Sequence, residues 1–220
     1  MRINKYLAWK KISTRRGADE LVNDRMVLIN GKQAVLGSKV NEGDKVTVRE
    51  EKDPAKIKQY VYFAYNKPIG IETTSPKEGL FPLGRLDKAS HGLLIVTNDG
   101  RITDQLLNPK YVHEKEYVVK TKEKLRSSFK AKMEAGVNIE GYKTQKCQVK
   151  IMNDFTFRII LTEGKKHQIR RMCSALFQEV ADLKRERIMN IKLGNAKPKS
   201  LREIKGLELS TFLNQVLHQS

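Results

Sequence analysis

From Tyr60 onward, the chain is a series of short apolar runs of strand length, interrupted by three stretches with helical spacing. The runs are "YVYFAYNKP", "LLIVTNDG", "KEYVVKT", "CQVKIM" and "TFRIILTEG", and the other stretches are "RITDQLLN", "LRSSFKAKMEAG" and "HQIRRMCSALF". Short apolar runs bounded by turn residues predict strands, whereas apolar residues three and four apart predict helices. Several strands are close enough in sequence to form hairpins. We therefore predict an α+β domain over residues 60–220, with a mixed, mostly antiparallel sheet.

Residues 1–49 have a different pattern and predict a separate small domain. "INKYLAWKKI" and "STRRGADELVND" have helical spacing, and Ser13 and Thr14 are suitable N-caps for the second helix. The pair Asn30-Gly31 between two extended runs predicts a β-hairpin, and "VNEGDKVTVRE" adds an alternating strand. The charged segment 50–59, "EEKDPAKIKQ", has no periodicity and predicts a linker.

The charge of the chain favours a polyanionic partner. Lys and Arg total 43 against 25 acidic residues, which gives a formal net charge of +18. Such an excess opposes compaction, but it is useful for binding nucleic acid or an anionic membrane surface. The longest apolar run is too short to span a bilayer, and the N-terminus lacks the long apolar core of a secretory signal. We therefore expect a nucleic acid partner and no membrane partner.

The cysteines and histidines do not form a metal-binding pattern. The two cysteines, Cys147 and Cys173, lack CxxC spacing, and the four histidines are scattered. Isolated cysteines are most often small core residues, and we interpret both in this way. This composition fits a reducing compartment, so we expect a cytoplasmic protein with no metal site.

Four segments of the second domain combine turn residues with charge and one candidate chemical group. They are "NKPIG" (66–70), "GRLDKASHGLLIVTNDG" (84–100), "EKEYVV" (114–119) and "EGKKHQIRRMC" (163–173). Each lies at the end of a predicted strand or helix, where functional sites are usually built. In the second segment, Asp87 precedes a buried strand. Both a salt bridge at the start of that strand and a catalytic carboxylate are consistent with this position.

In this order, the four segments resemble the motifs of the RsuA/RluA superfamily of pseudouridine synthases. The N-terminal features "RINKYLA", "STRRGADELV" and "VLINGK" resemble the S-four-type (alpha-L) RNA-binding domain, which indicates the RsuA-like branch. The resemblance implies isomerisation of uridine to pseudouridine in structured RNA without a metal, a cofactor or ATP. The implied substrate is large-subunit ribosomal RNA, with a transfer RNA, tRNA(Tyr), as a candidate second substrate. We also expect a monomer.

The resemblance implies roles for the residues that match its motifs. Asp87 matches the catalytic carboxylate, which could attack the substrate covalently or remove a proton from the sugar. Tyr117 matches the ring that packs on the target uracil, and Ile169 matches the apolar wall of the uracil pocket. Arg170 matches the cation that pairs with the catalytic carboxylate and keeps it ionised.

Further positions are expected to bind the substrate or the RNA backbone. Arg85 is our candidate for the side chain that fills the space left by the flipped uridine. Lys67 is expected to act in substrate binding, by positioning the loop beside the site. The tail "KRERIMNIKLGNAKPKSLREIKGLE", with eight basic residues against three acidic ones, is expected to widen the cationic surface. Cations expected to contact phosphates are Arg2, Lys5, Arg15, Arg16, Arg25, Lys32, Lys165, Lys166 and Arg171.

The residues leave two other functions open. The chain could be a non-catalytic RNA-binding or ribosome-assembly factor, in which Asp87 only anchors Arg170. It could also be a hydrolase that releases uracil and leaves an abasic sugar. His91 and His167 have no Ser, Cys or carboxylate at a suitable spacing, so we predict no general-base role for them. The loop "SPKEGLFPL" is shorter than the family pattern leads us to expect, so substrate selection could differ.

Overall fold

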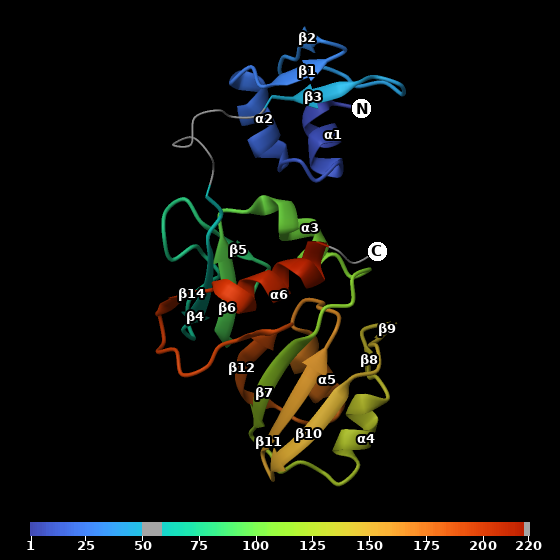
Figure 1. Ribbon diagram of the computed structural model, residues 1–220. Helices are drawn as coiled ribbons and strands as arrows, with labels where there is room; N and C mark the ends of the chain where they lie inside the picture. The colour runs from blue at the N-terminus through green and yellow to red at the C-terminus, as the bar shows by residue number, and fades with distance from the viewer. Residues whose placement is uncertain (50–58, 218–220) are drawn as a thin grey trace. The chain divides into compact units, whose positions relative to one another are not determined.

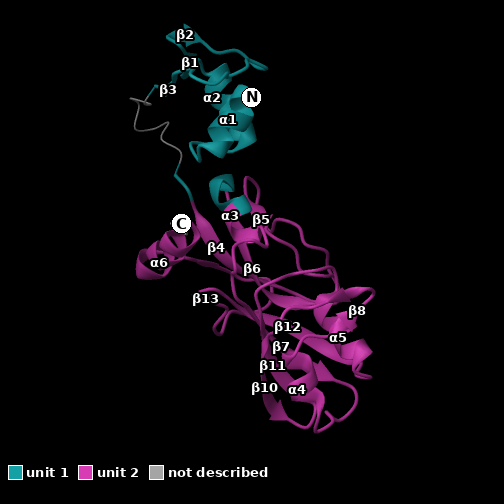
Figure 2. Cartoon of the chain, turned by 90° about the vertical axis from the view of Figure 1, so that its right-hand side faces the viewer, with its two compact units in different colours: residues 1–60, 99–104 teal, residues 61–98, 105–220 magenta. Residues whose placement is uncertain are grey.

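The computed structural model describes residues 1–49 and 59–217. The chain forms two compact units, one of residues 1–60 with 99–104 and the other of residues 61–98 with 105–220 (Figure 2). The predicted linker, residues 50–59, lies outside the described residues except for Gln59.

The first unit packs two helices on a small antiparallel sheet of strand order β2-β1-β3. The side-chain hydroxyl of Thr14 accepts a hydrogen bond from the backbone N–H of Gly17 (2.9 Å) and caps the second helix, as the sequence predicts. Asn30 and Gly31 both have positive φ (51° and 78°), which is the backbone that a two-residue hairpin turn requires. The elements are α1 (Ile3–Trp9), α2 (Arg15–Asn23), β1 (Val27–Ile29), β2 (Lys32–Gln33) and β3 (Val46–Val48).

The second unit is built on a mixed sheet of strand order β10-β11-β7-β12-β6-β4-β14 (Figure 1). Only the β6–β12 pair is parallel among the described strands of this sheet, so the prediction of a mostly antiparallel sheet is confirmed. Two shorter strands extend it, with β5 paired to β6 and β13 paired to β12. The strands are β4 (Tyr62–Lys67), β5 (Phe81–Leu83), β6 (His91–Thr97), β7 (Lys115–Thr121), β10 (Gln148–Asn153), β11 (Thr156–Leu161), β12 (Val180–Ile188), β13 (Ile191–Lys192) and β14 (Leu201–Glu203).

Helices and a small hairpin complete this unit. The 3-10 helix η2 (Gly100–Ile102), which belongs to the first unit, leads into α3 (Thr103–Leu107), whose last three residues belong to the second. A two-stranded ladder joins β8 (Asn138–Ile139) to β9 (Tyr142–Lys143). α4 (Phe129–Glu134) and α5 (Gln168–Ala175) lie beside β7, β10 and β11 at the lower end of Figure 1. Their apolar side chains share one buried cluster with those strands. The last helix, α6 (Gly206–Leu217), buries two of its own apolar side chains.

The first part of the basic segment after Leu183, which was expected to widen the cationic surface, is instead a central strand. Lys184 to Ile188 belong to β12, which lies between β7 and β6 in the middle of the sheet. Its charged residues are not a solvated surface, because Arg185 is buried and Arg187 pairs with two carboxylates. Charged residues dominate this strand, and its register shifts between Arg185 and Arg187. A regular apolar alternation was therefore absent from the sequence.

Two further expectations concern the membrane and the cysteines. No helix within the described ranges has both the length and the apolar character that a bilayer span requires. Both cysteines are free thiols, and both belong to the apolar cluster under α5 or pack against it. Burial raises the pKa of the Cys173 thiol to about 12 and that of the Cys147 thiol to about 11. Cys173 is therefore a core residue, as predicted, whereas Cys147 is only partly buried at the edge of the same cluster.

Candidate active site

A pocket of about 580 Å³ lies in the second unit. Three of the four segments singled out in the sequence line it, together with the loop that follows α3 and three residues of β12. The segments therefore meet in space although the most distant of their lining residues, Gly84 and Ile169, are 85 positions apart in the printed sequence. The pocket is lined by charged, aromatic and apolar residues that include Arg85, Asp87, Lys115, Tyr117, Glu163, Lys165, Lys166, His167, Ile169 and Arg185.

Asp87 lies in the loop between β5 and β6, and 35% of its side chain is exposed. One carboxylate oxygen, Oδ1, is 3.4 Å from Nε2 of His167, which is the residue just before α5. His167 adopts a left-handed backbone conformation (φ 53°), which is uncommon for a residue other than glycine. No such partner for His167 was visible in the sequence, because Asp87 lies 80 positions earlier in the chain.

The backbone around Asp87 is held in place by hydrogen bonds. Every carbonyl oxygen from residue 85 to residue 89 accepts one, and four of the five donors come from other segments of the fold. Such a loop can hold a side chain in one orientation, which an active site requires. The bonds are Arg185 Nη1 to Arg85 (3.4 Å), Thr73 Oγ1 to Leu86 (2.7 Å), Ser90 N to Asp87 (2.9 Å), Gly70 N to Lys88 (2.8 Å) and Arg170 Nη2 to Ala89 (2.8 Å).

The expectation that Arg170 pairs with Asp87 is not met by the structure. The Arg170 guanidinium donates to the carbonyls of Ala89 (2.8 Å) and Val180 (3.2 Å), and its Nη2 lies 3.5 Å from the Ser90 hydroxyl. Among the described residues, the basic group within ion-pair distance of Asp87 is instead His167. Arg170 therefore acts on the loop backbone just after Asp87, because the chain turns there and presents carbonyl oxygens to α5.

Lys67 is also placed differently from a substrate-binding residue. Its side chain is only 1% exposed, and it does not line the pocket. Nζ donates to the carbonyls of Pro68 (3.0 Å) and Ile71 (2.7 Å), so it fixes the "NKPIG" loop. Burial lowers the pKa of Lys67, and the nearby Asp87 carboxylate opposes this shift. Direct contact with substrate is therefore excluded in this conformation, and the positioning of the loop is what the structure shows.

Three other predicted residues line the same pocket as Asp87. Tyr117 projects from β7, and Ile169 lies in the first turn of α5, where it also packs in the core. Arg85 is exposed, two residues before Asp87. The structure thus places the aromatic ring of Tyr117, the apolar side chain of Ile169 and the long cationic side chain of Arg85 in one pocket with the Asp87 carboxylate.

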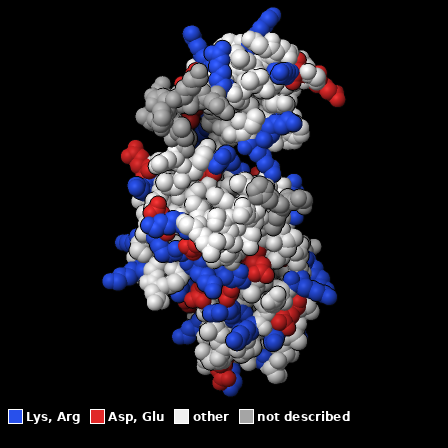
Figure 3. Space-filling view, in the orientation of Figure 1, with Lys and Arg blue, Asp and Glu red and all other residues white. Residues whose placement is uncertain are grey.

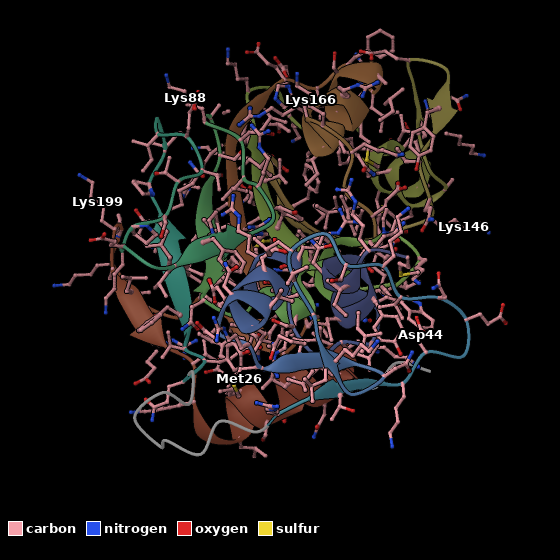
Figure 4. All side chains as sticks on the ribbon, turned by 90° about the horizontal axis from the view of Figure 1, so that it is seen from above. Met26, Asp44, Lys88, Lys146, Lys166 and Lys199 are labelled. Atoms are coloured by element: carbon pink, nitrogen blue, oxygen red, sulfur yellow. The ribbon has the colours of Figure 1, made fainter. Side chains whose placement is uncertain are left out.

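The cations expected to contact RNA fall into two groups. Lys165 and Lys166 are exposed and line the pocket, and Lys88 and Lys166 both point away from the ribbon along one edge of the view in Figure 4. Arg171 differs, because its Nη2 pairs with Glu140 Oε2 at 2.6 Å. Lys and Arg side chains gather over both units on the face shown in Figure 3. Those predicted in the first unit are all exposed: Arg2, Lys5, Arg15, Arg16, Arg25 and Lys32.

Sequence reasoning missed two cations of the pocket, Lys115 and Arg185. Lys115 is two residues before Tyr117 on β7, so the strand period alone places it on the same face of the sheet. Burial, with a contribution from Arg185, lowers the pKa of the Lys115 ammonium to about 8. Arg185 had no local signal, because only the pairing of β12 with β6 and β7 brings it to the pocket.

The sequence and the fold both match known proteins. Residues 61–175 match the RNA pseudouridylate synthase family, and residues 1–46 match the S4 domain. The chain is 40% identical over 207 residues to the dual-specificity RNA pseudouridine synthase RluF of Escherichia coli (strain K12), covering 88% of this chain and 71% of that one. The chain belongs to the RNA pseudouridine synthase family.

Other relatives agree with this assignment. The ribosomal large subunit pseudouridine synthase B of Bacillus subtilis (strain 168) is 31% identical, with 94% of this chain and 95% of that one covered. The crystal structure of a pseudouridylate synthase has the same fold, with a TM-score of 0.70 at 24% identity over 99% of this chain and all of that one. This RNA pseudouridine synthase therefore isomerises uridine to pseudouridine in RNA, as the resemblance of its sequence implied. The family assignment supports this activity over the two alternatives, a non-catalytic RNA-binding factor and a uracil-releasing hydrolase.

Proposed function

We propose that Asp87 is the carboxylate with which this synthase isomerises a uridine of large-subunit ribosomal RNA. One observation carries the assignment. Two carboxylates line the pocket among the described residues, and only Asp87 is available to a substrate. Glu163 is buried and already accepts hydrogen bonds from the Tyr142 hydroxyl, the Gln145 backbone (2.9 Å) and the Gln168 side chain (2.6 Å).

The surrounding residues have separate roles in this proposal. Tyr117 and Ile169 enclose the uracil, and Arg85 fills the place that the uridine leaves when it flips out of the RNA stack, which costs a few kcal/mol. His167 holds one oxygen of Asp87, and the other oxygen is free to face the sugar. Arg170 supports catalysis through the loop backbone. Precise placement of this kind is the main contribution of a rigid site to a unimolecular rearrangement.

The choice of RNA rests on the relatives and on the cationic surfaces. RluF is named for dual specificity, and the Bacillus subtilis relative is named for the ribosomal large subunit. We propose the same class of substrate here, with tRNA(Tyr) as the second one, in the cytoplasm where these RNAs are found. The protein acts as a monomer without a metal, and its domains span residues 1–49 and 60–220. Exposed cations of the S4 domain and of the loop before α5 bind phosphates.

Pseudouridine mapping of total RNA tests this function. Cells that lack the gene are compared with cells that carry the wild-type gene, the Asp87→Asn variant or the Asp154→Asn variant. Asp154 is a matched control, because it is an exposed carboxylate in an ion pair with Lys124 (2.8 Å) and does not line the pocket. We expect the wild type and Asp154→Asn to restore the same site or sites, and Asp87→Asn to restore none.

The outcomes separate the parts of the proposal. A site restored by Asp87→Asn would remove the catalytic assignment without affecting the family. Restored sites only in transfer RNA, or only in the small ribosomal subunit, would remove the proposed substrate. If the wild type restored no site in any RNA, the proposed function as a whole would be wrong.

A further inference from the structure

Two buried or half-buried cations line the pocket without a carboxylate partner. Arg185 is 3% exposed, and its Nε donates to the carbonyl of Leu93 (2.7 Å). Its Nη2 is buried and has no hydrogen-bond partner among the described residues. Lys115 Nζ has a single hydrogen bond, to the carbonyl of His113 at 3.3 Å. Within residues 1–49 and 59–217, no carboxylate lies within ion-pair distance of either cation.

The sheet places both cations next to the ring that is expected to contact the uracil. Arg185 on β12 is directly opposite Tyr117 on β7, so their side chains share one face of the sheet. Lys115 is two residues from Tyr117 on the same strand and therefore shares that face too. Arg185 also touches the loop of Asp87, because its Nη1 donates to the carbonyl of Arg85 (3.4 Å). The two cations thus belong to the inner wall of the pocket.

Such an arrangement is costly for the free protein. A cation taken out of water loses hydration, and a neighbouring cation adds repulsion instead of compensation. Both costs lower the pKa of Lys115 to about 8, with burial as the larger cause and the charge of Arg185 as the smaller one. Unpaired cations that line a pocket can stabilise negative charge that develops on a substrate there during the reaction.

We propose that Lys115 and Arg185 bind the uracil ring through its carbonyl oxygens and stabilise the negative charge that it carries while detached from the ribose. This inference rests on the proposed site around Asp87. In the isomerisation, the bond between C1′ and N1 breaks and its electron pair passes to the ring, where O2 and O4 share the charge. A bond between C1′ and C5 then forms, C5 loses a proton and N1 gains one, so the composition of the RNA is unchanged. Fixed donors at the site of the developing charge lower the barrier.

A binding site for an RNA phosphate is the competing explanation for two such cations. Phosphates of the backbone lie outside the flipped base, and exposed cations such as Lys165 and Lys166 can meet them at the pocket rim. The two explanations differ in what a substitution changes. Loss of a phosphate contact weakens RNA binding, whereas loss of charge stabilisation slows the chemical step at saturating enzyme.

The test measures both quantities for Lys115→Met. The probe is a transcript of large-subunit ribosomal RNA with tritium at C5 of its uridines, because formation of the C1′–C5 bond releases that tritium. Excess enzyme gives the single-turnover rate, and filter binding of the same transcript gives the Kd. We expect Lys115→Met to lower the rate by about 100-fold and to change the Kd by less than about threefold. Lys120→Met, an exposed lysine on the same strand, is the matched control and should retain the wild-type rate.

Lys115→Arg provides the second variant, because it keeps the charge and adds donors. We expect it to retain a tenth or more of the wild-type rate. The inference is overturned by a Lys115→Met rate within threefold of the wild type, by a loss confined to the Kd, or by a Lys115→Arg variant that folds and is as slow as Lys115→Met. Failure of the proposed function gives a different result, because the wild type would then release no tritium from this transcript.

Discussion

The two faces of the β7–β12 pair use their charged residues in opposite ways. On the face away from the pocket, Arg187 pairs with Glu116 (2.6 Å) and Glu114 (2.9 Å). Arg158 of β11 joins the same network through Glu116 and Glu186, both at 3.1 Å. On the pocket face, no carboxylate lies within ion-pair distance of Lys115 or Arg185 among the described residues.

One irregularity in β12 produces this difference. The register with β7 shifts between Arg185 and Arg187, so Arg185 is opposite Tyr117 whereas Arg187 is opposite Glu116. Adjacent residues of β7 point to opposite faces, and the bulge therefore sends two arginines that are two positions apart to opposite sides of the sheet. Arg187, which stabilises the fold, is paired with carboxylates, whereas Lys115 and Arg185, which we propose act in the reaction, are positioned to interact with the substrate.

The largest loss of stability should come from disrupting the pairing of β6 with β12 at Gly92 and Arg185. Gly92 of β6 has a φ of 105°, and a Cβ there would lie 2.3 Å from the carbonyl oxygen of Arg185. We expect Gly92→Ala to cost more than about 3 kcal/mol of unfolding free energy, because β6 and β12 would have to separate. Chemical denaturation measures the loss. Gly194→Ala also has positive φ (62°) but meets open space, so it should cost only about 1–2 kcal/mol.

Removing a cation from the paired face should destabilise the protein. Arg187→Met removes the Arg187 partner of both Glu114 and Glu116. Glu116 is largely buried, with 12% of its side chain exposed, and retains its pairing with Arg158. We expect a loss of about 3 kcal/mol in denaturant titrations. The rate of the folded variant should stay near that of the wild type, since Arg187 does not line the pocket. Lys205→Met, which breaks an exposed pair with Glu203, is the control and should leave stability unchanged.

Removing a cation from the pocket face should instead increase the free energy of unfolding. Because the folded pKa of Lys115 is about 8, below its ordinary value of 10.5, the unfolded chain binds more protons between these two pH values. The stability of the wild type should therefore rise as pH increases from 8 to 10.5. Lys115→Met should be more stable than the wild type by about 1–3 kcal/mol below pH 8, and the gain should vanish above pH 10.5. Denaturation at a series of pH values measures this; a destabilised variant at pH 7 contradicts it.

The smallest effect concerns the exposed cations at the pocket rim. Replacing Lys165 and Lys166 together with Met should leave stability and the single-turnover rate nearly unchanged. The affinity for RNA should fall, and the slope of log Kd against log salt should decrease by about 1.5 if both contact phosphates. The double replacement of Lys197 and Lys199 is the control, because it removes the same charge from residues that do not line the pocket. Equal slopes for the two double variants would show that no specific contact was lost.

Local patterns in the sequence predicted most of the elements. The runs that became β4, β6, β7, β10 and β11 and the helical stretches of α3, α4 and α5 were recognisable, as was the Asn30-Gly31 turn. The motifs likewise indicated Asp87, Tyr117 and Ile169, which the structure brings to one pocket. Periodicity and turn chemistry depend on neighbouring residues, so they can be recognised without knowledge of the fold.

Other properties required the tertiary structure. The position of β12 in the centre of the sheet and the contact of Arg170 with the loop backbone were not predicted. The partnership of His167 with Asp87 and the two unpaired cations of the pocket were likewise missed. All of these depend on strand register and on contacts between residues far apart in the chain, and a one-residue shift in register reverses the face to which a charge points. The sequence by itself determined the elements, the family and the catalytic candidate, and the register decided which charges are left to meet the uracil.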